Sequence, residues 1–331
     1  MAFLKSIARE IVFPVTVALH LEKLFSSLSI HNRLILCYHG VVDTPQHNIS
    51  LGPISTKQFA QHLSYFKENF DVVSQDIIID MYRSNFIPQK KTIAITFDDG
   101  YENNYTNAYP LLKKFNFPST MYIIAQCIED ENKLAWFDYF DFIKNDIDIT
   151  KIDFGKLKTK VPPNKSQLRS LIKSLNIDKR NILFEELKKQ VNLDAYTKKY
   201  SRNHWKLMNS KEVRFLFDSG LVEIGSHSYN HPNLGLINID DAKKEIIRSK
   251  EMIESIIQAK VNSIAFPDGS YSSEVKKACL DAGYKNLLAV GPLPPVDKND
   301  VSILPRGGVS STTTFESNII QINRSFKYSG F

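Results

Sequence analysis

Short apolar runs alternate with amphipathic helical stretches along most of this chain, and this alternation limits the fold more than any other feature. The runs are strand-like and rich in Ile, Leu, Val and Phe, a habit of strands that are buried on both faces of a parallel sheet. Strands that alternate with helices indicate βα units, so we expect a parallel sheet, either open or closed into a barrel. The expected strands lie at residues 33–39, 92–97, 119–125, 221–227, 261–266, 286–291 and 301–305.

The alternation breaks between residues 126 and 205. This stretch is rich in Lys, Asn and Asp, contains Pro162 and Pro163, and is typical of helical and irregular structure. We therefore expect an insertion over residues 126–205 within a main domain of residues 33–310. A helical segment over residues 1–32 and a C-terminal helix or tail over residues 311–331 complete the expected organisation.

Composition and charge exclude several classes of protein. The 331 residues are 43% hydrophobic and 24% charged, as in an ordinary soluble globular protein. The net charge of +6 is spread out, with no basic block and no nucleic-acid motif, so we expect no nucleic-acid partner. The three cysteines are far apart and form no CxxC motif, which favours a reducing compartment over a disulfide framework.

The N-terminus has an apolar run from Ile11 to Leu19 that is too short to span a bilayer and contains Pro14. No small-residue cleavage site follows the run, so no signal peptide is recognised. Apolar residues recur at helical spacing from Phe3 to Ile11, which predicts a helix that either lies on a membrane surface or covers the bottom of the fold. The expected location is cytoplasmic, or peripheral on the inner membrane surface through this helix.

The expected strand at residues 92–97 ends in two adjacent carboxylates, Asp98 and Asp99, followed by Gly100. Like charges this close resist ionisation unless a positive charge lies nearby. A turn or a helix N-cap is the simpler explanation, because Asp-Gly is common in turns. Four other strands, however, also end in unusual polar residues, and in a βα barrel such strand ends meet at one mouth. These residues are His39, His227 with His231, Asp268, and Arg306.

His227 and His231 are four residues apart, a spacing that lets two imidazoles face one ion. Such a pair alone is more often structural. Two histidines and one carboxylate, however, leave coordination positions open for water and substrate, as hydrolytic zinc sites do. A metal would also explain the adjacent carboxylates, because one can bind the ion while the other stays ionised beside it as a base.

Three phrases resemble the motifs of the polysaccharide deacetylase family, carbohydrate esterase family four. They are TFDDG at residues 96–100, HSYNH at residues 227–231 and FPDGSYS at residues 266–272. ILCYHGV at residues 35–41 and ILPR at residues 303–306 resemble the branch that deacetylates bacterial exopolysaccharides. The resemblance covers about residues 33–310 apart from the insertion. It implies an α/β fold, a distorted (β/α) barrel of about seven parallel strands with a largely helical insertion.

The resemblance also implies a role for individual residues. Asp99, His227 and His231 would hold a divalent metal, usually Zn²⁺, and Asp98 would be the general base. The turn made by Asp268, Gly269, Ser270 and Tyr271 would supply backbone N–H groups for the oxyanion. The implied reaction is attack of metal-activated water on the N-acetyl amide of an amino sugar, in a polysaccharide or a lipid-linked oligosaccharide.

Two positions depart from the family pattern. Ala265 stands where the family has an arginine that orients the base, and we expect Arg306 to replace it, although Arg306 could instead form a surface ion pair. The family's late histidine, which protonates the leaving amine, is missing from ILPRGG at residues 303–308. We expect His39 to protonate the leaving amine instead. The alternative is that His39 only forms a hydrogen bond near the mouth.

Other functions stay open at this point. A deformylase or small-amide hydrolase would use the same scaffold and metal. A non-catalytic sugar-binding protein fits the two departures, but it would have no need for Asp98 beside the ligand set. The aromatic stretch at residues 136–143, WFDYFDFI, is either the core of a helix or a platform on which a sugar stacks.

Overall fold

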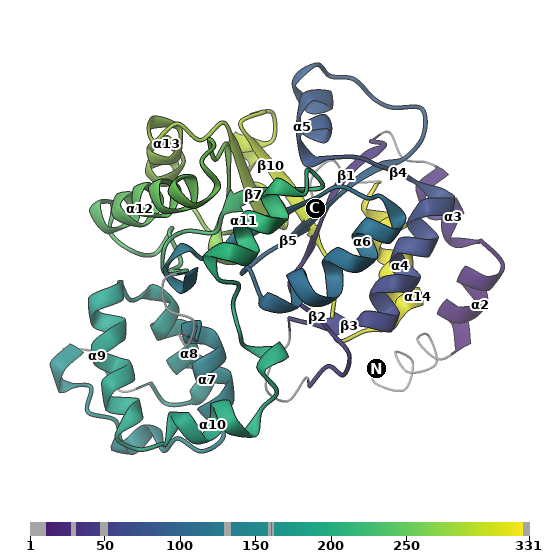
Figure 1. The fold of residues 1–331 in the computed structure, drawn as a ribbon. Helices are drawn as coiled ribbons and strands as arrows, with labels where there is room; N and C mark the ends of the chain where they lie inside the picture. The colour runs from purple at the N-terminus through teal and green to yellow at the C-terminus, as the bar shows by residue number, and fades with distance from the viewer. Residues whose placement is uncertain are drawn as a thin grey trace.

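The structure is a computed structural model that describes residues 11–27, 31–46, 52–128, 134–157, 160 and 162–326. Within these residues, seven parallel strands form a closed barrel (Figure 1). Their order is β1-β10-β9-β8-β7-β6-β5, and β5 pairs back with β1 from Arg33↔Thr92 to Tyr38↔Phe97. The expected barrel is thus confirmed. Its strands are β1 (Arg33–Tyr38), β5 (Thr92–Phe97), β6 (Ser119–Ile123), β7 (Val222–Ser226), β8 (Ser263–Ala265), β9 (Asn286–Val290) and β10 (Ile303–Gly308).

The last strand differs most from its expected range. It was expected to end at Pro305, but β10 continues to Gly308 because it pairs with both neighbours there, through Arg306↔Val290 on β9 and Leu36↔Gly307 on β1. Arg306 therefore lies inside the strand and not after it. A short strand, β4 (Asp71–Val72), adds to the outer edge of β5, and β2 (Val41–Val42) pairs with β3 (Ile54–Ser55).

Helices cover the outside of the barrel (Figure 1). The apolar face of α4 (Thr56–Asn69) is buried at Phe59, Leu63 and Phe66. Its N-cap Ser55 accepts a hydrogen bond from the Gln58 N–H at 3.0 Å, as a serine at this position predicts. The other helices of this layer are α6 (Tyr109–Phe115), α11 (Ser210–Asp218), α12 (Ile239–Ile257), α13 (Ser273–Asp281) and α14 (Phe315–Ser325). Helix α5 (Gln75–Arg83) packs against interior residues at one end of the barrel, and α2 (Phe13–Ala18) and α3 (Glu22–Ser27) lie against α14.

The interior of the barrel is packed at one end and polar at the other. Ile78 and Ile79 of α5 pack against apolar interior residues, and these belong to one cluster. The cluster also contains Ile35, Ala94, Tyr122, Ala265, Leu288 and Leu304. The Arg306 guanidinium lies 5.1 Å from the centre of the Tyr122 ring, so a buried cation borders this apolar layer. The polar end of the barrel is where the strands end, and it holds the candidate site.

The insertion forms a helical group beside the barrel, at lower left in Figure 1. Its helices are α7 (Trp136–Ile143), α8 (Lys165–Ser174), α9 (Ile177–Lys188) and α10 (Leu193–Lys199). They bury an apolar cluster of their own, which includes Phe140, Leu168, Leu183 and Leu187. The largely helical insertion expected from the sequence is therefore present.

The N-terminal helices α2 and α3 lie against α14, and Glu22 of α3 accepts a hydrogen bond from the Tyr65 hydroxyl at 2.9 Å. Val15 and Leu19 are nevertheless exposed, so both roles predicted for this segment stay open. Residues 1–10 and 28–30 of the predicted segment lie outside the described residues. Among the described helices, none has the length and apolar character needed to cross a membrane.

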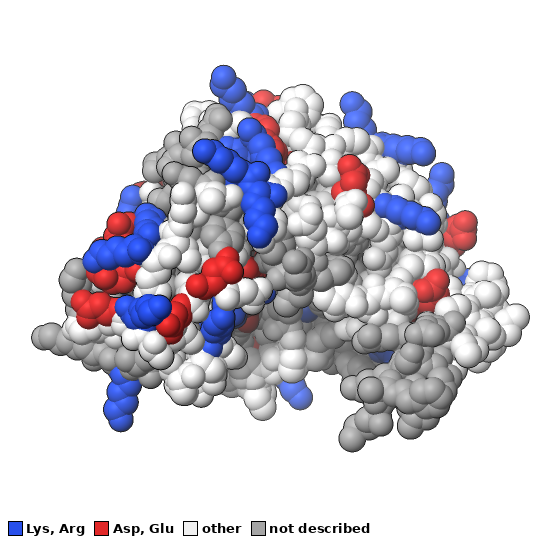
Figure 2. Space-filling model, turned by 90° about the horizontal axis from the view of Figure 1, so that it is seen from below, with Lys and Arg blue, Asp and Glu red and all other residues white. Residues whose placement is uncertain are grey.

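Figure 2 shows acidic and basic side chains interleaved over the helical insertion, at left.

Candidate active site

The structure brings the polar strand-end residues together at one mouth of the barrel. Asp98 and Asp99 follow β5, His227 follows β7, and His39 follows β1. All carboxyl ends of parallel strands in a closed barrel point the same way, which is why residues far apart in sequence meet here.

Asp99, His227 and His231 converge on one point. The Asp99 Oδ1 atom lies 3.6 Å from His227 Nε2 and 3.5 Å from His231 Nε2, and all three side chains are buried. One ligand atom from each residue lies within 4.8 Å of the others. The backbone at Asp99 (φ 72°) and His231 (φ 53°) is left-handed, a costly conformation that concentrates at functional sites.

Neighbouring groups orient the two histidines. His227 Nδ1 lies 2.8 Å from the Ala265 carbonyl, which holds the proton on Nδ1 and leaves the Nε2 lone pair facing Asp99. For His231 it is the backbone that is held: its backbone N–H donates to Ser228 Oγ at 3.0 Å and its carbonyl accepts from Trp136 Nε1 at 2.8 Å. Among the described residues, its ring Nδ1 has no hydrogen-bond partner. The Phe137 ring lies edge-on to the His231 ring at 4.8 Å. Helix α7 of the insertion thus supports a residue of the barrel mouth.

This donor set fits a divalent cation. Burial lowers the pKa of His227, and burial together with His227 lowers the pKa of His231 well below its ordinary value, so both rings are neutral. Burial and the nearby Asp98 charge raise the pKa of Asp99 well above its ordinary value. Three buried acceptor atoms that face one another need a positive charge between them. Two imidazoles and one carboxylate are ligands that zinc prefers, and they leave coordination positions open.

Asp98 is held by Arg306 through two hydrogen bonds. Arg306 Nη1 donates to Asp98 Oδ1 at 2.7 Å and Nη2 donates to Oδ2 at 2.8 Å, with both side chains buried. Burial opposes the charge of Asp98, but Arg306 more than offsets this and keeps the pKa of Asp98 well below its ordinary value. The predicted alternative for Arg306, a surface ion pair, is wrong, because its side chain is fully buried within the barrel.

The side chains of Thr96 and Cys37 also contact this ion pair, and Thr96 contacts its arginine. Its hydroxyl accepts from Arg306 Nη1 at 3.1 Å and donates to the Leu36 carbonyl at 2.8 Å. The Cys37 thiol donates to Asp98 Oδ2 at 3.3 Å. The sequence did not indicate a contact of Cys37, because its neighbours in the chain are apolar and the contact spans the barrel.

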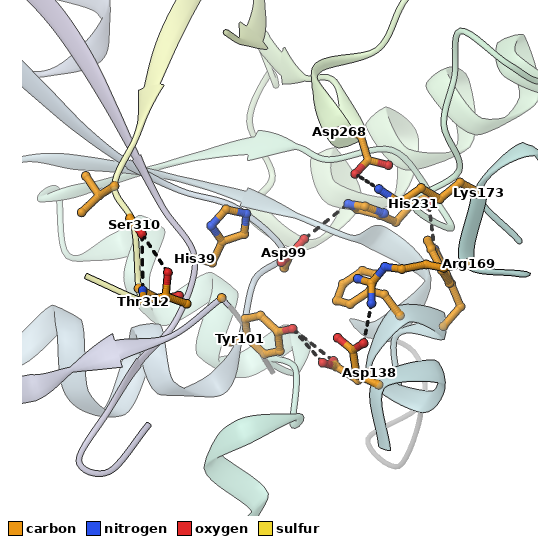
Figure 3. A pocket seen from close by; sticks show the side chains of 16 residues that line it. His39, Asp99, Tyr101, Asp138, Arg169, Lys173, His231, Asp268, Ser310 and Thr312 are labelled. Atoms are coloured by element: carbon orange, nitrogen blue, oxygen red, sulfur yellow. Dashed lines mark hydrogen bonds and ion pairs between the residues drawn. The ribbon is translucent and has the colours of Figure 1, made fainter. Parts of the chain in front are cut away.

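His39 lies at the edge of the same mouth. Figure 3 shows His39 and His231 on opposite sides of Asp99, so a group bound above Asp99 would lie between the two rings. Burial lowers the pKa of His39, and the Asp98 charge partly opposes this. The structure therefore places His39 next to the site, and its role as a proton donor stays a prediction.

The turn after β8 differs from its expected use. The Gly269 N–H donates to the Phe266 carbonyl at 2.8 Å and the Ser270 N–H donates to the Pro267 carbonyl at 3.1 Å. These two N–H groups are used inside the turn and are not free to bind an oxyanion. The N–H groups of Asp268 and Tyr271 stay predicted donors, and of these two residues only Asp268 lines the cavity at the mouth. The Tyr271 side chain stacks on Phe266 and its hydroxyl donates to Asp297 at 2.7 Å, so it closes the turn.

A cavity of about 390 Å³ opens at this mouth, and the insertion forms one of its walls (Figure 3). The Tyr101 hydroxyl donates to Asp138 at 3.0 Å, and Lys173 pairs with Asp268 at 2.5 Å, so side chains of the insertion contact residues of the mouth. The insertion contributes Trp136, Phe137, Asp138, Asp141, Arg169 and Lys173 to the lining.

The aromatic stretch at residues 136–143 forms part of the core of the insertion, as one of its two predicted roles requires, and its role as a sugar-stacking platform stays a prediction. Trp136 and Phe137 line the cavity, while Phe140, Phe142 and Ile143 are buried in the core of the insertion. Tyr101, Arg169 and Lys173 were not indicated by the sequence. Their places in the cavity lining depend on how the insertion packs on the barrel, and the spacing of residues in the sequence does not predict that packing.

Comparisons with known proteins agree with this arrangement. The family model described as polysaccharide deacetylase matches residues 87–160 and 188–287. A Bacillus subtilis protein named as a polysaccharide deacetylase, YxkH, is 33% identical over 93 residues, which are 27% of this chain and 33% of that protein. The poly-β-1,6-N-acetyl-D-glucosamine N-deacetylase of Staphylococcus aureus is 46% identical over 43 residues, 13% of this chain and 15% of that enzyme. The chain thus matches a third or less of the length of these curated relatives.

Solved structures show the same fold. The structure of IcaB from Ammonifex degensii has a TM-score of 0.59 at 15% identity and covers 89% of this chain and 98% of that chain. The Streptococcus pyogenes deacetylase PplD, solved in complex with acetate, has a TM-score of 0.58 at 18% identity and covers 87% of this chain and 96% of that chain.

Proposed function

The chain belongs to the polysaccharide deacetylase family, and from this premise we propose that it is a metal-dependent hydrolase that removes N-acetyl groups from amino sugars of a glycan. One observation carries the proposal. The ligand set of Asp99, His227 and His231 lies beside a carboxylate, Asp98, that Arg306 keeps ionised. A site that only binds sugar has no use for this second carboxylate.

The residues divide the reaction among them. A divalent metal held by Asp99, His227 and His231 would acidify the attacking water and polarise the amide carbonyl. Asp98 takes a proton from the water as its oxygen attacks the acetyl carbon. The C–N bond then breaks, and His39 gives a proton to the leaving amine nitrogen. Because burial lowers the pKa of His39 and leaves its ring neutral, this proton is the one that the nearby Asp98 took from the water, and acetate and a free amino sugar result. We assign the oxyanion to the Asp268 N–H, because Asp268 lines the cavity and its N–H is not used inside the turn.

The low pKa of Asp98 has a consequence for this assignment. Arg306 keeps the Asp98 carboxylate in its basic form at any working pH, but it also makes it a weak proton acceptor. Asp98 can act as the base only for a water that is already acidic. Asp98 and the ligand set are therefore effective together, and neither is sufficient alone.

The substrate we propose is a polymer or lipid-linked oligomer of N-acetylglucosamine. The similarity to the Staphylococcus aureus enzyme, whose name states that it acts on poly-β-1,6-N-acetyl-D-glucosamine, supports this choice. The cavity supports it as well, because aromatic and hydrogen-bonding side chains line it together. Trp136 and Phe137 offer apolar faces for a sugar ring, and the exposed Thr312 offers a hydroxyl group for hydrogen bonds to the sugar.

Acetate release tests the proposal. Metal-loaded wild type is incubated with β-1,6-linked N-acetylglucosamine oligomers, next to an Asp98→Asn variant whose metal content is matched, and both acetate and formate are measured. We expect acetate from the wild type and a loss of at least about 100-fold in the variant. Formate from N-formylated oligomers, with no acetate from the acetylated ones, would indicate a deformylase. Tight binding of oligomers without release of either acid would indicate a sugar-binding protein.

A further inference from the structure

A second cavity, of about 270 Å³, lies between the barrel and the helical insertion. It borders Trp136 and His231, as the first cavity does, but its other walls are different and the proposed reaction does not use it. Helix α7 forms one side with Tyr139, and helix α9 forms another side with Ile177 and Phe184. In Figure 1 both helices belong to the group at lower left.

Two buried polar residues line this cavity, and each has one side-chain atom that forms no hydrogen bond. Arg180 is 2% exposed and Asn230 is 6% exposed. Among the described residues, neither Arg180 Nε nor Asn230 Oδ1 has a hydrogen-bond partner. Leaving buried polar atoms without partners costs about 1–3 kcal/mol for each group, so such atoms usually have a use.

The rest of Arg180 is held firmly. Its Nη1 donates to the Asn230 carbonyl at 2.9 Å, its Nη2 donates to the Leu175 carbonyl at 3.2 Å, and the guanidinium lies 4.9 Å from the centre of the Trp136 ring. The Arg180 Nε–H is therefore an unused donor and Asn230 Oδ1 an unused acceptor on two residues of the cavity wall. Each atom has less than 1 Å² of accessible surface, so a ligand reaches them only as neighbouring side chains of the wall move aside. A hydroxyl group both accepts and donates, so a ligand that carries several hydroxyl groups satisfies both atoms.

The charges around the cavity compensate one another. Glu185 and Lys188 are exposed on α9 and pair with each other at 2.8 Å. Glu245 accepts hydrogen bonds from the Asn230 backbone and side chain, and its negative charge opposes that of Arg180. The cavity thus has no excess charge to attract a phosphate or an ammonium group. A neutral polar ligand fits it better than an ion.

We propose that this cavity is a saccharide subsite that binds one neutral sugar ring, with Trp136, Tyr139 and Phe184 supplying apolar faces and Arg180 and Asn230 binding hydroxyl groups. Its volume is just below the range of roughly 300–1,000 Å³ typical of pockets for drug-sized ligands, so it admits one ring and not a chain. That the sugar is N-acetylglucosamine rests on the proposed function. The ring comes either from the glycan being deacetylated or from a separate saccharide.

Residues on α9 provide the test, because they line this cavity and not the first one. Asn181 is an exposed lining residue, and we expect its replacement by tryptophan to narrow the cavity. Because the metal ligand His231 borders the same cavity, the metal content of the variant is matched to that of the wild type. Ile182 is the next residue of the same helix, is 37% exposed and lies outside the lining, so Ile182→Trp is the matched control.

The full, metal-loaded chain is titrated with N-acetylglucosamine and with its β-1,6-linked trimer, and the amide resonances of α9 are followed by NMR. We expect saturable shifts on α9 in the wild type and in Ile182→Trp, with an affinity at least 10-fold weaker in Asn181→Trp. Tighter binding of the trimer assigns the ring to the glycan, and equal affinity assigns it to a separate saccharide.

Two results would overturn the subsite: α9 shifts that do not saturate, or an affinity that Asn181→Trp leaves unchanged. Inorganic phosphate that produces the same shifts at lower concentration would overturn the choice of a neutral ligand. Acetate release separates this proposal from the previous one. Release without α9 binding rejects the subsite alone, and α9 binding without release rejects the deacetylase alone.

Discussion

Arg306 and Asp98 form an ion pair that is sealed inside the barrel mouth, although 208 residues separate them in the chain. Both carboxylate oxygens are engaged, at 2.7 and 2.8 Å, which is the two-point geometry that only an arginine provides. Ala265 belongs to the apolar layer that includes Tyr122, and Arg306 lies over the Tyr122 ring. The small side chain at position 265 therefore leaves this part of the barrel to an arginine from β10.

Removing Arg306 should cost both stability and activity. Arg306→Met leaves Asp98 buried without a partner, so we expect a loss of about 3–5 kcal/mol in the free energy of unfolding. The double variant Asp98→Asn with Arg306→Met should lose less free energy of unfolding than the two single variants together, because neither charge of the pair is then left buried without its partner. Urea unfolding of the four proteins measures this coupling. Losses that simply add would show that the two side chains do not depend on each other.

Metal binding should depend on the three converging ligands. Asp99→Ala and His231→Ala should each reduce bound divalent metal from one ion per chain to a small fraction, measured by elemental analysis after dialysis. Asp141→Asn is a suitable control, because Asp141 lines the same cavity but pairs with Arg169, and its metal content should be unchanged. Removal of the metal from the wild type should also lower the melting temperature, since a ligand that binds only the folded state stabilises it. Full metal content in Asp99→Ala would refute the ligand assignment.

His39 should affect turnover more than substrate binding. We expect His39→Gln to lower kcat by about 100-fold to 10,000-fold, with unchanged metal content and a similar KM, because general acids act in the transition state. His204→Gln serves as the control, since His204 contacts the Thr44 carbonyl and does not line the cavity. Steady-state kinetics on one N-acetylated oligomer compare the two. Wild-type turnover in His39→Gln would require another proton donor.

Glu223 should make stability depend on pH. Burial, and then the Asp76 charge, raise the pKa of Glu223 to about 7, while the Thr120 hydroxyl, a donor at 3.1 Å, partly opposes this. The folded state therefore keeps a proton that the unfolded state loses at about pH 4.5, and stability falls as the pH rises from there to about 7.

The replacement Glu223→Gln should remove this dependence. Because glutamine stays neutral and still accepts from Thr120, we expect it to stabilise the protein by about 3 kcal/mol at pH 8 and by almost nothing at pH 4. Thermal unfolding of both proteins across this range measures the difference. A gain of equal size at both pH values would mean that the effect does not come from ionisation.

The sequence by itself determined the strands and the residues that follow them. Runs such as residues 92–97 are apolar throughout because both faces of a parallel strand are buried, and this signal is local. The carboxyl ends of such strands share one mouth, so the convergence of Asp99, His227 and His231 could be expected from their places after β5 and β7.

Only the tertiary structure decided how these residues are held and enclosed. The partner of Asp98, the thiol contact of Cys37, and the wall that Trp136 and Lys173 form all join segments that are far apart in the chain. The tertiary structure also removed two of the four predicted oxyanion donors, because the Gly269 and Ser270 N–H groups form hydrogen bonds inside the turn. The spacing of residues along the sequence predicts contacts within one helix or strand. Contacts between elements depend on how the barrel closes and how the insertion packs against it, and these follow from the summed burial of many side chains and not from any single motif.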